Sequence, residues 1–342
     1  MPRVQPSAPV VATRAAAAPH KTVEIVSERA ALPKIKELIK SAKKTIDIVA
    51  YNFYSESGDV KDIAQQLIQK KKDNPNIQIR VFIEGDHGDG AARNMKTVAL
   101  LKAAGIDVVV DSKNLITHAK GICIDSQTVL AGSTNLTNTS LDQNNETNAL
   151  VSSPAIGKAW RKYIDTLVAD PTHLHASTTK IGKVSLLTDD AYYDQLMTMV
   201  KSCKKGDTLD AVMYYISSSP NDKKTQALLS ELEKAAGRGV TIKMYLEQDN
   251  SGFAPDITAS NRKVAERLRK AGIEIHFDPA DKITHAKAIV KNKKEALLGS
   301  TNWSASDFDG RHQLNWHITD ESAAADVAAW IENKMATETG DG

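Results

Sequence analysis

The chain has 342 residues, of which 41% are hydrophobic and 25% are charged, and its formal net charge is +2. This composition is typical of a soluble globular protein of about two domains, and it excludes a disordered chain and a disulfide-stabilised miniprotein. The small net charge does not indicate a nucleic-acid binder, and no apolar stretch approaches the roughly 18 residues that a membrane span requires.

Residues 1–21 form a Pro- and Ala-rich segment that is interrupted by Pro6, Pro9 and Arg14. Because these interruptions are unfavourable in the apolar core of a signal peptide, we expect a disordered tail, with a targeting segment as the less favoured alternative. The two cysteines, Cys123 and Cys203, suggest neither a disulfide framework nor a metal site. A cytoplasmic location is slightly favoured over a secreted or periplasmic one.

Helix and strand patterns alternate along the first half of the chain. Apolar residues at helical spacing predict a helix over 30–42, and a buried strand follows over 45–51. The further elements that we expect are helices over 60–71 and 92–104, strands over 77–84, 107–111, 121–125 and 128–131, and a short helix within 152–177. Strands that alternate with helices indicate an α/β sheet covered by helices on both faces.

The second half of the chain repeats the first. The segment ITHAKGICIDSQTVLAGSTNLT (116–137) matches ITHAKAIVKNKKEALLGSTNWS (283–304) without a gap, which aligns His118 with His285. Upstream segments also match, among them IDIVAYNFYS (46–55) and LDAVMYYISS (209–218). We therefore expect two similar α/β/α sandwich domains related by a pseudo-twofold axis. Their expected bounds are 22–172 and 173–338.

Each copy contains a His-x-Lys motif, His118/Lys120 in the first and His285/Lys287 in the second. In an extended segment, residues i and i+2 project to one face, so each pair is expected to point the same way. Histidine serves as a nucleophile or proton-transfer group near neutral pH, and lysine supplies positive charge for a phosphoryl oxygen. Two halves packed about a pseudo-twofold axis would bring both pairs to one pocket, where one imidazole attacks phosphorus and the other protonates the leaving oxygen.

A Gly-Ser-Thr-Asn motif follows each histidine, and the spacing from the His to the Asn is the same in both copies. The glycine permits close approach of the backbone, and the hydroxyl and amide groups suit phosphate oxygens. The side chains that we expect to contact the substrate phosphate are Ser133, Asn135, Ser300, Asn302 and, further along the second copy, Gln313.

His118-x-Lys120-x4-Asp125, followed by the Gly-Ser-Thr-Asn motif, resembles the HKD signature of the phospholipase D superfamily, and the similarity spans about residues 22–335. This resemblance implies a bilobal α/β/α fold and catalysis without a metal or other cofactor. It also implies a covalent phosphohistidine intermediate that water or an alcohol resolves. Asp125 enters the set of expected catalytic residues through this resemblance, as a supporting scaffold.

The two copies differ at one aligned position downstream of the histidine, where the first copy has Glu146 and the second has Gln313. In superfamily members that this chain resembles, a carboxylate at this offset holds the histidine ring. A carboxylate stabilises the imidazolium, whereas a neutral amide can only orient the ring. We therefore predict that His118, assisted by Glu146, is the nucleophile and that His285, oriented by Gln313, is the general acid. The alternative is that the difference arose by drift and that either histidine attacks.

Three functions remain open at this point. The duplicated signature within one chain favours phospholipase-D-type hydrolysis of phospholipids, which is compatible with peripheral membrane contact. The segment NNETN (144–148) resembles the small endonuclease and mitochondrial branch of the superfamily, and the lysine runs 70–72 and 291–294 would suit a nucleic-acid backbone.

A catalytically silent binding module is the third function, and Asn292, which stands where the first copy has Asp125, is its best support. The four intact His and Lys residues argue against it. A chain that holds both motifs needs no partner to complete its pocket, so we expect a monomer without an obligate protein partner.

Overall fold

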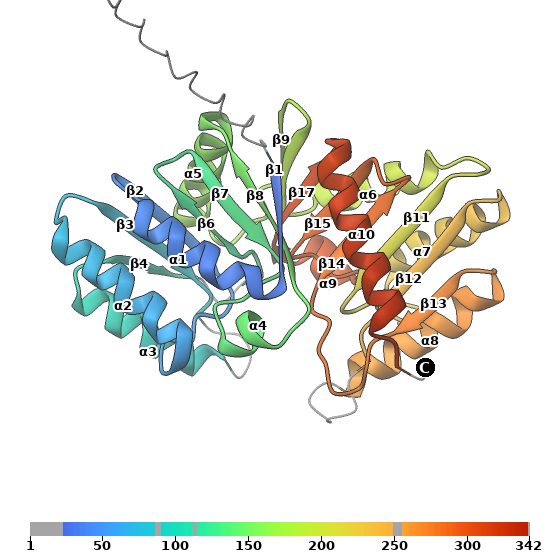
Figure 1. Ribbon diagram of the computed structural model, residues 1–342, viewed down its shortest axis with the longest axis horizontal. Coiled ribbons are helices and arrows are strands. Elements are labelled where there is room, and N and C mark those ends of the chain that lie inside the picture. Colours follow the sequence, from blue (N-terminus) through green and yellow to red (C-terminus); the bar gives the residue numbers. More distant parts are fainter. Residues whose placement is uncertain (1–22, 86–89, 112–114, 249–254, 341–342) are drawn as a thin grey trace, which may run out of the picture.

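The computed structural model describes residues 23–85, 90–111, 115–248 and 255–340. The predicted tail, residues 1–21, lies outside these residues. Two mixed β-sheets flanked by helices lie side by side (Figure 1), with α1, α2 and α3 along the outer side of one sheet and α7 and α8 along the outer side of the other. The predicted α/β class with two similar sandwich domains is therefore confirmed.

The first half forms a seven-stranded sheet of order β1-β8-β7-β6-β2-β3-β4, in which β2, β3 and β4 are parallel. Its strands are β1 (Val23–Ser27), β2 (Thr45–Ala50), β3 (Gln78–Ile83), β4 (Asp107–Val110), β6 (Gly121–Ile124), β7 (Thr128–Gly132) and β8 (Thr147–Ser152). Its helices are α1 (Ala31–Ser41), α2 (Gly58–Asp73), α3 (Ala91–Ala103), α4 (Asn138–Asp142) and α5 (Pro154–Ala169).

The second half repeats this order as β10-β17-β15-β14-β11-β12-β13 and adds β9 beside β10 at the edge. Its strands are β9 (Ser177–Ile181), β10 (Val184–Thr188), β11 (Thr208–Met213), β12 (Thr241–Leu246), β13 (Glu274–Phe277), β14 (Lys287–Lys291), β15 (Glu295–Gly299) and β17 (Leu314–Ile318). Its helices are α6 (Ala191–Lys201), α7 (Lys223–Gly237), α8 (Pro255–Lys270), α9 (Ala305–Asp309) and α10 (Glu321–Thr337). A separate two-stranded pair joins the halves, β5 (Ile116–Thr117) with β16 (Arg311–His312).

The elements predicted for the first half are present, with bounds shifted by at most two residues. The helix expected to be short within 152–177 is α5, which has 16 residues, so that expectation was wrong. Ser153 begins α5 by accepting the backbone N–H of Ala155, and Pro154 occupies its first turn. The predicted domain bounds remain a prediction. The connection between the two sheets is α5, and this helix packs in the core that both halves share.

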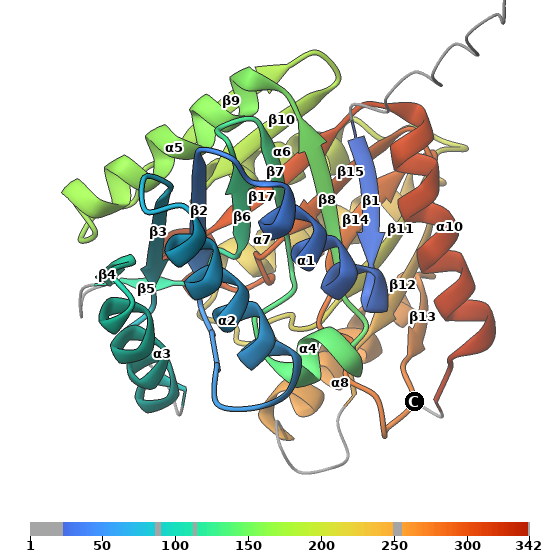
Figure 2. The same ribbon diagram turned by 60° about the vertical axis from the view of Figure 1, so that its left-hand side comes forward.

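A common apolar core joins the two halves. Side chains alternate along each strand, so Ile46 and Ile48 of β2 face the outer helices, while Val49 faces the common core together with Trp160 of α5. Figure 2 shows α1 and α2 in front of the first sheet. Apolar residues of both sheets and of α5 and α10 make up this common core. It therefore sets the position of one half relative to the other, and with it the geometry of any site at their boundary.

Candidate active site

The two His-x-Lys motifs enter the boundary between the halves through reciprocal backbone contacts. The amide of His118 donates to the carbonyl of His312, which belongs to β16, at 2.9 Å. On the other side, Asn145 bridges to Thr284, and its carbonyl accepts the amide of His285 at 2.9 Å. Each motif is thus held by a segment of the opposite half, as a pseudo-twofold arrangement requires.

Each imidazole is also held by a side chain of the opposite half. His285 Nδ1 lies 3.0 and 3.1 Å from the carboxylate oxygens of Glu146, and His118 Nδ1 lies 3.2 Å from Oε1 of Gln313. The predicted pairing, His118 with Glu146 and His285 with Gln313, was therefore wrong. The reason is the crossing of the backbone at the boundary: Glu146 follows Asn145, which is bonded to the second motif, so its side chain reaches His285.

The environments of the two histidines lower their pKa values to different extents. Burial lowers the pKa of His285, and the carboxylate of Glu146 opposes that effect in part. Burial lowers the pKa of His118 well below its usual range, and the cations of Lys120 and Arg311 lower it further. The imidazole of His118 is therefore neutral at neutral pH, and its pKa is lowered more strongly than that of His285, where Glu146 favours the protonated form.

Glu146 is fully buried, and its pKa reflects the contact with His285. Burial alone would raise this pKa, but the charges of His285 and Lys287 and the hydroxyl of Ser133 lower it by more. Glu146 is therefore a carboxylate at neutral pH and provides a negative charge beside one imidazole.

Both motif lysines are almost completely buried. Lys120 Nζ donates to the carbonyl of His118, and Lys287 Nζ donates to that of His285. Burial lowers the pKa of Lys287 to about 7 and that of Lys120 well below its usual range. A phosphate placed between them would favour their charged forms, because an opposite charge at close range raises the pKa of an ammonium group.

Two tyrosines at equivalent positions flank these pairs and were not among the predicted site residues. Tyr51 meets the ring of His118 at 4.9 Å between centroids, and Lys120 Nζ lies 5.0 Å from the centre of the Tyr51 ring. Tyr214 stands at 4.8 Å from the His285 ring in the same manner. The repeat alignment of 46–55 with 209–218 superimposes the two tyrosines, so this duplication was the signal that could have identified them.

The two serines that were predicted to bind phosphate instead bond to the side chains that hold the histidines. Ser133 Oγ donates to Glu146, and Ser300 Oγ donates to Gln313 Oε1 at 2.6 Å. Their hydroxyl protons are thus committed to the side chains that hold the histidines, which does not favour the predicted contact with phosphate. Asn135 and Asn302 lie in the same region, and among the described residues their buried Oδ1 atoms have no hydrogen-bond partner.

Asp125 lies at the far end of β6 from the motif, a position that suits the supporting scaffold implied by the resemblance and does not suit direct contact with the substrate. Its carboxylate accepts the backbone N–H groups of Lys43, Lys44 and Thr45, which lead into β2. It lies five positions along the chain from Lys120, which in an extended strand corresponds to roughly 16 Å. Asn292 makes the equivalent contact in the second half, where its Oδ1 accepts the amide N–H of Thr208 at 2.8 Å. The departure from the HKD signature therefore changes a residue that anchors the backbone, and the two His/Lys pairs are unaffected.

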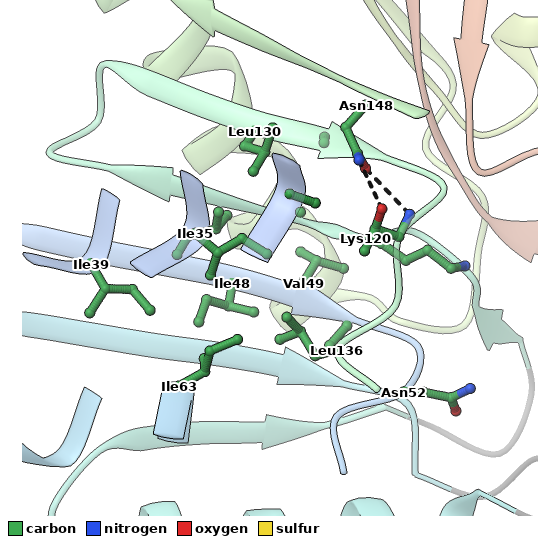
Figure 3. Close-up of a pocket in the computed structure, with 16 residues that line it drawn as sticks. Ile35, Ile39, Ile48, Val49, Asn52, Ile63, Lys120, Leu130, Leu136 and Asn148 are labelled. Carbon is green, nitrogen blue, oxygen red and sulfur yellow. Dashed lines mark hydrogen bonds between the residues drawn. The ribbon is translucent and has the colours of Figure 1, made fainter. Parts of the chain in front are cut away.

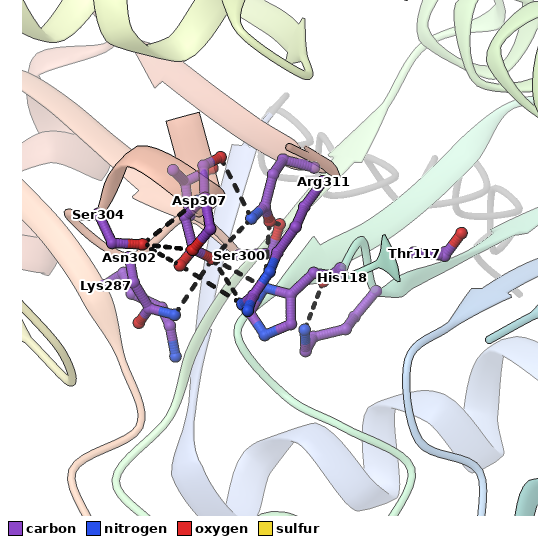
Figure 4. Close-up of polar contacts among 12 residues, drawn as sticks. Thr117, His118, Lys287, Ser300, Asn302, Ser304, Asp307 and Arg311 are labelled. Carbon is purple, nitrogen blue, oxygen red and sulfur yellow. Dashed lines mark hydrogen bonds and ion pairs between the residues drawn. The ribbon is translucent and has the colours of Figure 1, made fainter. Parts of the chain in front are cut away.

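The His118 side of the site contains an ion pair that the sequence did not reveal (Figure 4). Asp307 Oδ1 lies 3.6 Å from His118 Nδ1 and 3.3 Å from Arg311 Nη1. At the aligned positions of the repeat, the first half has Ser140 and Asn144. Because this pair has no counterpart in the first copy, the duplication gave no indication of it.

Buried carboxyl groups hold the residue that precedes each histidine. Thr117 donates its amide to Glu84 at 2.7 Å, and the amide of Thr284 donates to Glu247 and, at 3.0 Å, to Asp278. Burial raises the pKa of Asp278. These groups stand at the ends of strands of the two sheets, and they fix the backbone from which the histidines project.

A mostly apolar cavity lies behind Lys120, between α1 and the first sheet (Figure 3). Ile35, Ile48 and Leu130 line it, and Lys120 and Asn52 stand at one end. All of its lining residues belong to the first half, whereas the imidazoles meet at the boundary of the halves. The cavity therefore belongs to the outer core of the first half and is separate from the boundary at which the two motifs lie.

The fold and the reciprocal His-x-Lys pairs define a duplicated protein of the phospholipase D superfamily. Residues 35–168 and 196–335 match the family described as "Cardiolipin synthase, PLD-like domain". Since these two ranges cover more than half of the chain, the chain belongs to this family.

Curated relatives match only part of the chain. It is 29% identical over 109 residues to "Phospholipase D" of Rickettsia bellii, which covers 31% of the chain and 50% of that protein. It is 25% identical over 138 residues to "Mitochondrial cardiolipin hydrolase" of Chlamydomonas reinhardtii, which covers 40% of the chain and 56% of that protein. The chain thus spans about half the length of these relatives.

Solved structures are similar over nearly the whole chain. Phosphatidylserine synthase of Haemophilus influenzae superimposes with a TM-score of 0.73 and 14% identity, covering 93% of this chain and 87% of that one. Polyphosphate kinase of Porphyromonas gingivalis gives a TM-score of 0.59 and 13% identity, covering 91% of this chain and 50% of that one. At these identities the similarity shows the fold alone.

Two further observations concern the described part of the chain. None of its helices combines the length and the hydrophobicity that crossing a bilayer requires. In the same part, no three His, Cys, Asp or Glu side chains form a group that could hold a metal ion. Catalysis without a metal, the cytoplasmic location and the monomeric state stay predictions.

Proposed function

We propose that this protein hydrolyses phosphodiester bonds through a covalent phosphohistidine intermediate and that its substrates are phospholipids. The observation that carries the proposal is the reciprocal arrangement of the two imidazoles. Glu146 and Gln313 occupy Nδ1 of His285 and His118 from opposite halves, which leaves both Nε2 atoms for one substrate phosphate. Lys120 and Lys287 supply the positive charge that stabilises a pentavalent phosphorus.

In the first step, Nε2 of His118 attacks phosphorus and a nitrogen–phosphorus bond forms as the bond to the leaving oxygen breaks. His285, in its protonated form, gives its Nε2 proton to that oxygen. His118 suits the nucleophile because it is neutral, and His285 suits the acid because Glu146 stabilises its imidazolium. The proposed roles are those expected from the sequence, with the partners exchanged.

In the second step, the neutral His285 removes a proton from water as the water oxygen attacks phosphorus. The nitrogen–phosphorus bond breaks, and His118 returns to its neutral form. An alcohol in place of water would give transfer instead of hydrolysis. We propose that Asn135 and Asn302, one in each Gly-Ser-Thr-Asn motif, contact the phosphate, because an amide NH2 group can donate to a phosphate oxygen.

Phospholipids are favoured over nucleic acids by the family and by the lysine runs. The family description and the names of both curated relatives refer to lipid substrates or products. Lys70 and Lys71 donate to backbone carbonyls, and Lys293 and Lys294 pair with glutamates. These side chains are therefore less available for a nucleic-acid backbone than the sequence suggested.

The test is turnover by the full chain of four substrates in the presence of EDTA: bis(4-nitrophenyl) phosphate, vesicles of phosphatidylcholine, vesicles of cardiolipin, and single-stranded DNA. We expect cleavage of the chromogenic diester and of at least one lipid, and loss of both in His118→Asn and His285→Asn. Added ethanol distinguishes hydrolysis from transfer, since transfer gives a phosphatidylethanol product.

Cleavage of DNA alone, with a steep loss of rate as salt increases, would replace the lipid proposal with a nuclease. Absence of turnover on all four substrates would indicate a binding module.

A further inference from the structure

The side chains that hold the two imidazoles differ in a coordinated way. His285 contacts the carboxylate of Glu146 directly, whereas His118 contacts the amide of Gln313, and a carboxylate stands behind that amide at Asp307. The first-half counterpart of Asp307 is Ser140. One half thus has a carboxylate in contact with the ring, and the other has an amide backed by a carboxylate.

The orientation of the Gln313 amide follows from its neighbours. A carboxylate only accepts hydrogen bonds, so Nε2 of Gln313 must face Asp307 Oδ1, which lies at 2.8 Å. Oε1 then faces His118 Nδ1 at 3.2 Å and the hydroxyl of Ser300 at 2.6 Å. An amide oxygen can only accept, so Nδ1 of His118 carries the proton and Nε2 carries the lone pair.

Asp307 is held firmly enough to impose this orientation. It is 1% exposed, and Ser304 Oγ donates to its Oδ2 at 2.6 Å. Asn302 and Gln313 donate to Oδ1 at 3.3 and 2.8 Å, and Arg311 Nη1 lies 3.3 and 3.4 Å from the two oxygens. Four donors surround the carboxylate, so it is satisfied only as an acceptor.

We propose that Asp307 is a positioning residue, which acts through Gln313 to hold His118 as the tautomer whose Nε2 attacks phosphorus. The proposal rests on the proposed function and names a residue beyond the two motifs. When phosphorus bonds to Nε2, the ring acquires positive charge while Nδ1 keeps its proton. Asp307, 3.6 Å from Nδ1, stabilises that charge.

Arg311 explains how a carboxylate so near to His118 leaves the free imidazole neutral. Its guanidinium pairs with Asp307, and its charge contributes, after burial and Lys120, to the lowered pKa of His118. The pair adds no net charge to the site, whereas no lysine or arginine among the described residues forms such an ion pair with Glu146. The two imidazoles are thus prepared for different roles.

The first half of the chain supplies the design of the test. Asp307→Ser copies Ser140, and Gln313→Glu copies Glu146. We expect D307S to lower kcat on bis(4-nitrophenyl) phosphate roughly 10–100-fold with little change in KM, because Gln313 is then free to turn its NH2 group toward His118. The double variant D307S/Q313E gives His118 the direct carboxylate contact that His285 has, and it should recover kcat to within about tenfold of wild type.

The pH profile separates positioning from a general structural defect. His118 must be neutral to attack, so kcat/KM falls as pH falls through its pKa. A carboxylate at position 313 raises that pKa. The acidic limb of kcat/KM is therefore expected at higher pH in D307S/Q313E than in wild type.

The tautomer of His118 can also be read without any substrate, from the imidazole 15N chemical shifts. We expect the Nδ1–H form in wild type and loss of this preference in D307S. This measurement tests the inference even if the wild-type protein turns over no diester, an outcome that refutes the proposed function alone.

Asp309→Ser is the matched control, because Asp309 lies in the same helix α9, is exposed and pairs with Lys224. We expect it to keep wild-type kcat. Asp307→Asn serves if D307S does not fold, and it should lower kcat by removing the charge. Wild-type kcat in D307S or D307N, a double variant no more active than D307S, or a trapped phosphate on His285 would overturn the inference.

Discussion

Lys287 is a charged side chain in surroundings that disfavour its charge. It is 1% exposed, and burial lowers its pKa to about 7. A group whose folded pKa lies below its unfolded value reduces stability below the folded pKa, and this cost disappears as pH rises toward the ordinary lysine value. The proposed function therefore requires a positive charge at Lys287, although burial of that charge lowers the stability of the fold.

Replacing Lys287 with Met is expected to abolish turnover and to raise the free energy of unfolding by about 1–4 kcal/mol near neutral pH. The gain over wild type should be largest below about pH 7 and should decline toward pH 10.5. Urea unfolding of the variant and the wild type at several pH values measures the stability gain and its dependence on pH. Lys180→Met, at an exposed position on β9, is the control and should change stability little. A variant less stable than wild type at pH 6 would contradict this view of the site.

Glu146 affects how readily His285 takes up the proton that it donates in the proposed mechanism. Its carboxylate raises the pKa of His285 against the larger effect of burial. Since the acid must be protonated, kcat/KM falls as pH rises through that pKa. In Glu146→Gln the pKa of His285 drops further, so the alkaline limb of the profile should move to lower pH, with kcat reduced roughly 10–100-fold. Movement of that limb to higher pH, measured with the chromogenic diester, would exclude His285 as the acid.

At the scale of elements, the glycine of each Gly-Ser-Thr-Asn motif serves strand packing. A Cβ on Gly132, at the end of β7, would lie 2.4 Å from the carbonyl oxygen of Thr147 and 2.5 Å from Cα of Asn148. Both contacts belong to β8, which carries Glu146 toward the other half. The close approach that the sequence suggested is therefore made by a neighbouring strand.

Gly132→Ala is expected to force β7 and β8 apart, at a cost of about 1–3 kcal/mol in the free energy of unfolding, and to lower kcat by displacing Glu146. Gly237→Ala is the matched control, because a Cβ there meets nothing within 4 Å. In the last turn of α7 it should raise stability by up to about 1 kcal/mol. Thermal unfolding of both variants measures the contrast, and equal effects would show that β7 has room for the extra methyl group.

At the scale of the whole molecule, the halves share one core and are expected to unfold together. Trp316 of β17 is fully buried and donates its Nε1–H to the carbonyl of Ala131, on β7 of the other half, at 3.0 Å. Contacts of this kind make the site at the boundary dependent on the stability of both sheets.

Trp316→Phe removes the N–H that donates to the buried carbonyl of Ala131. The loss of this hydrogen bond should lower the free energy of unfolding by about 1–3 kcal/mol. Urea unfolding followed by fluorescence and by far-UV circular dichroism should give one coincident transition in wild type and variant. Trp160→Phe, at a buried position of α5 whose Nε1 has no hydrogen-bond partner among the described residues, is the control with the smaller expected cost. Two separate transitions would show that the halves are independent domains.

The amino-acid sequence by itself determined the fold class, the duplication and the two His/Lys pairs. The reason is that these features repeat: helical and strand periodicity marks the elements, and the ungapped matches between segments of the two copies mark equivalent positions. The same repeat could have identified Tyr51 and Tyr214. It could not have identified Asp307 and Arg311, because these residues occur in one copy only.

Only the tertiary structure decided which side chain serves which histidine. Glu146 stands nearer in the sequence to His118, but the backbone of Asn145 crosses to the second motif and takes Glu146 to His285. Sequence spacing measures distance along one half, whereas the site lies where two halves meet. The partner of each imidazole was therefore set by packing across the boundary, and so were the charge beside it and the extent to which its pKa is lowered.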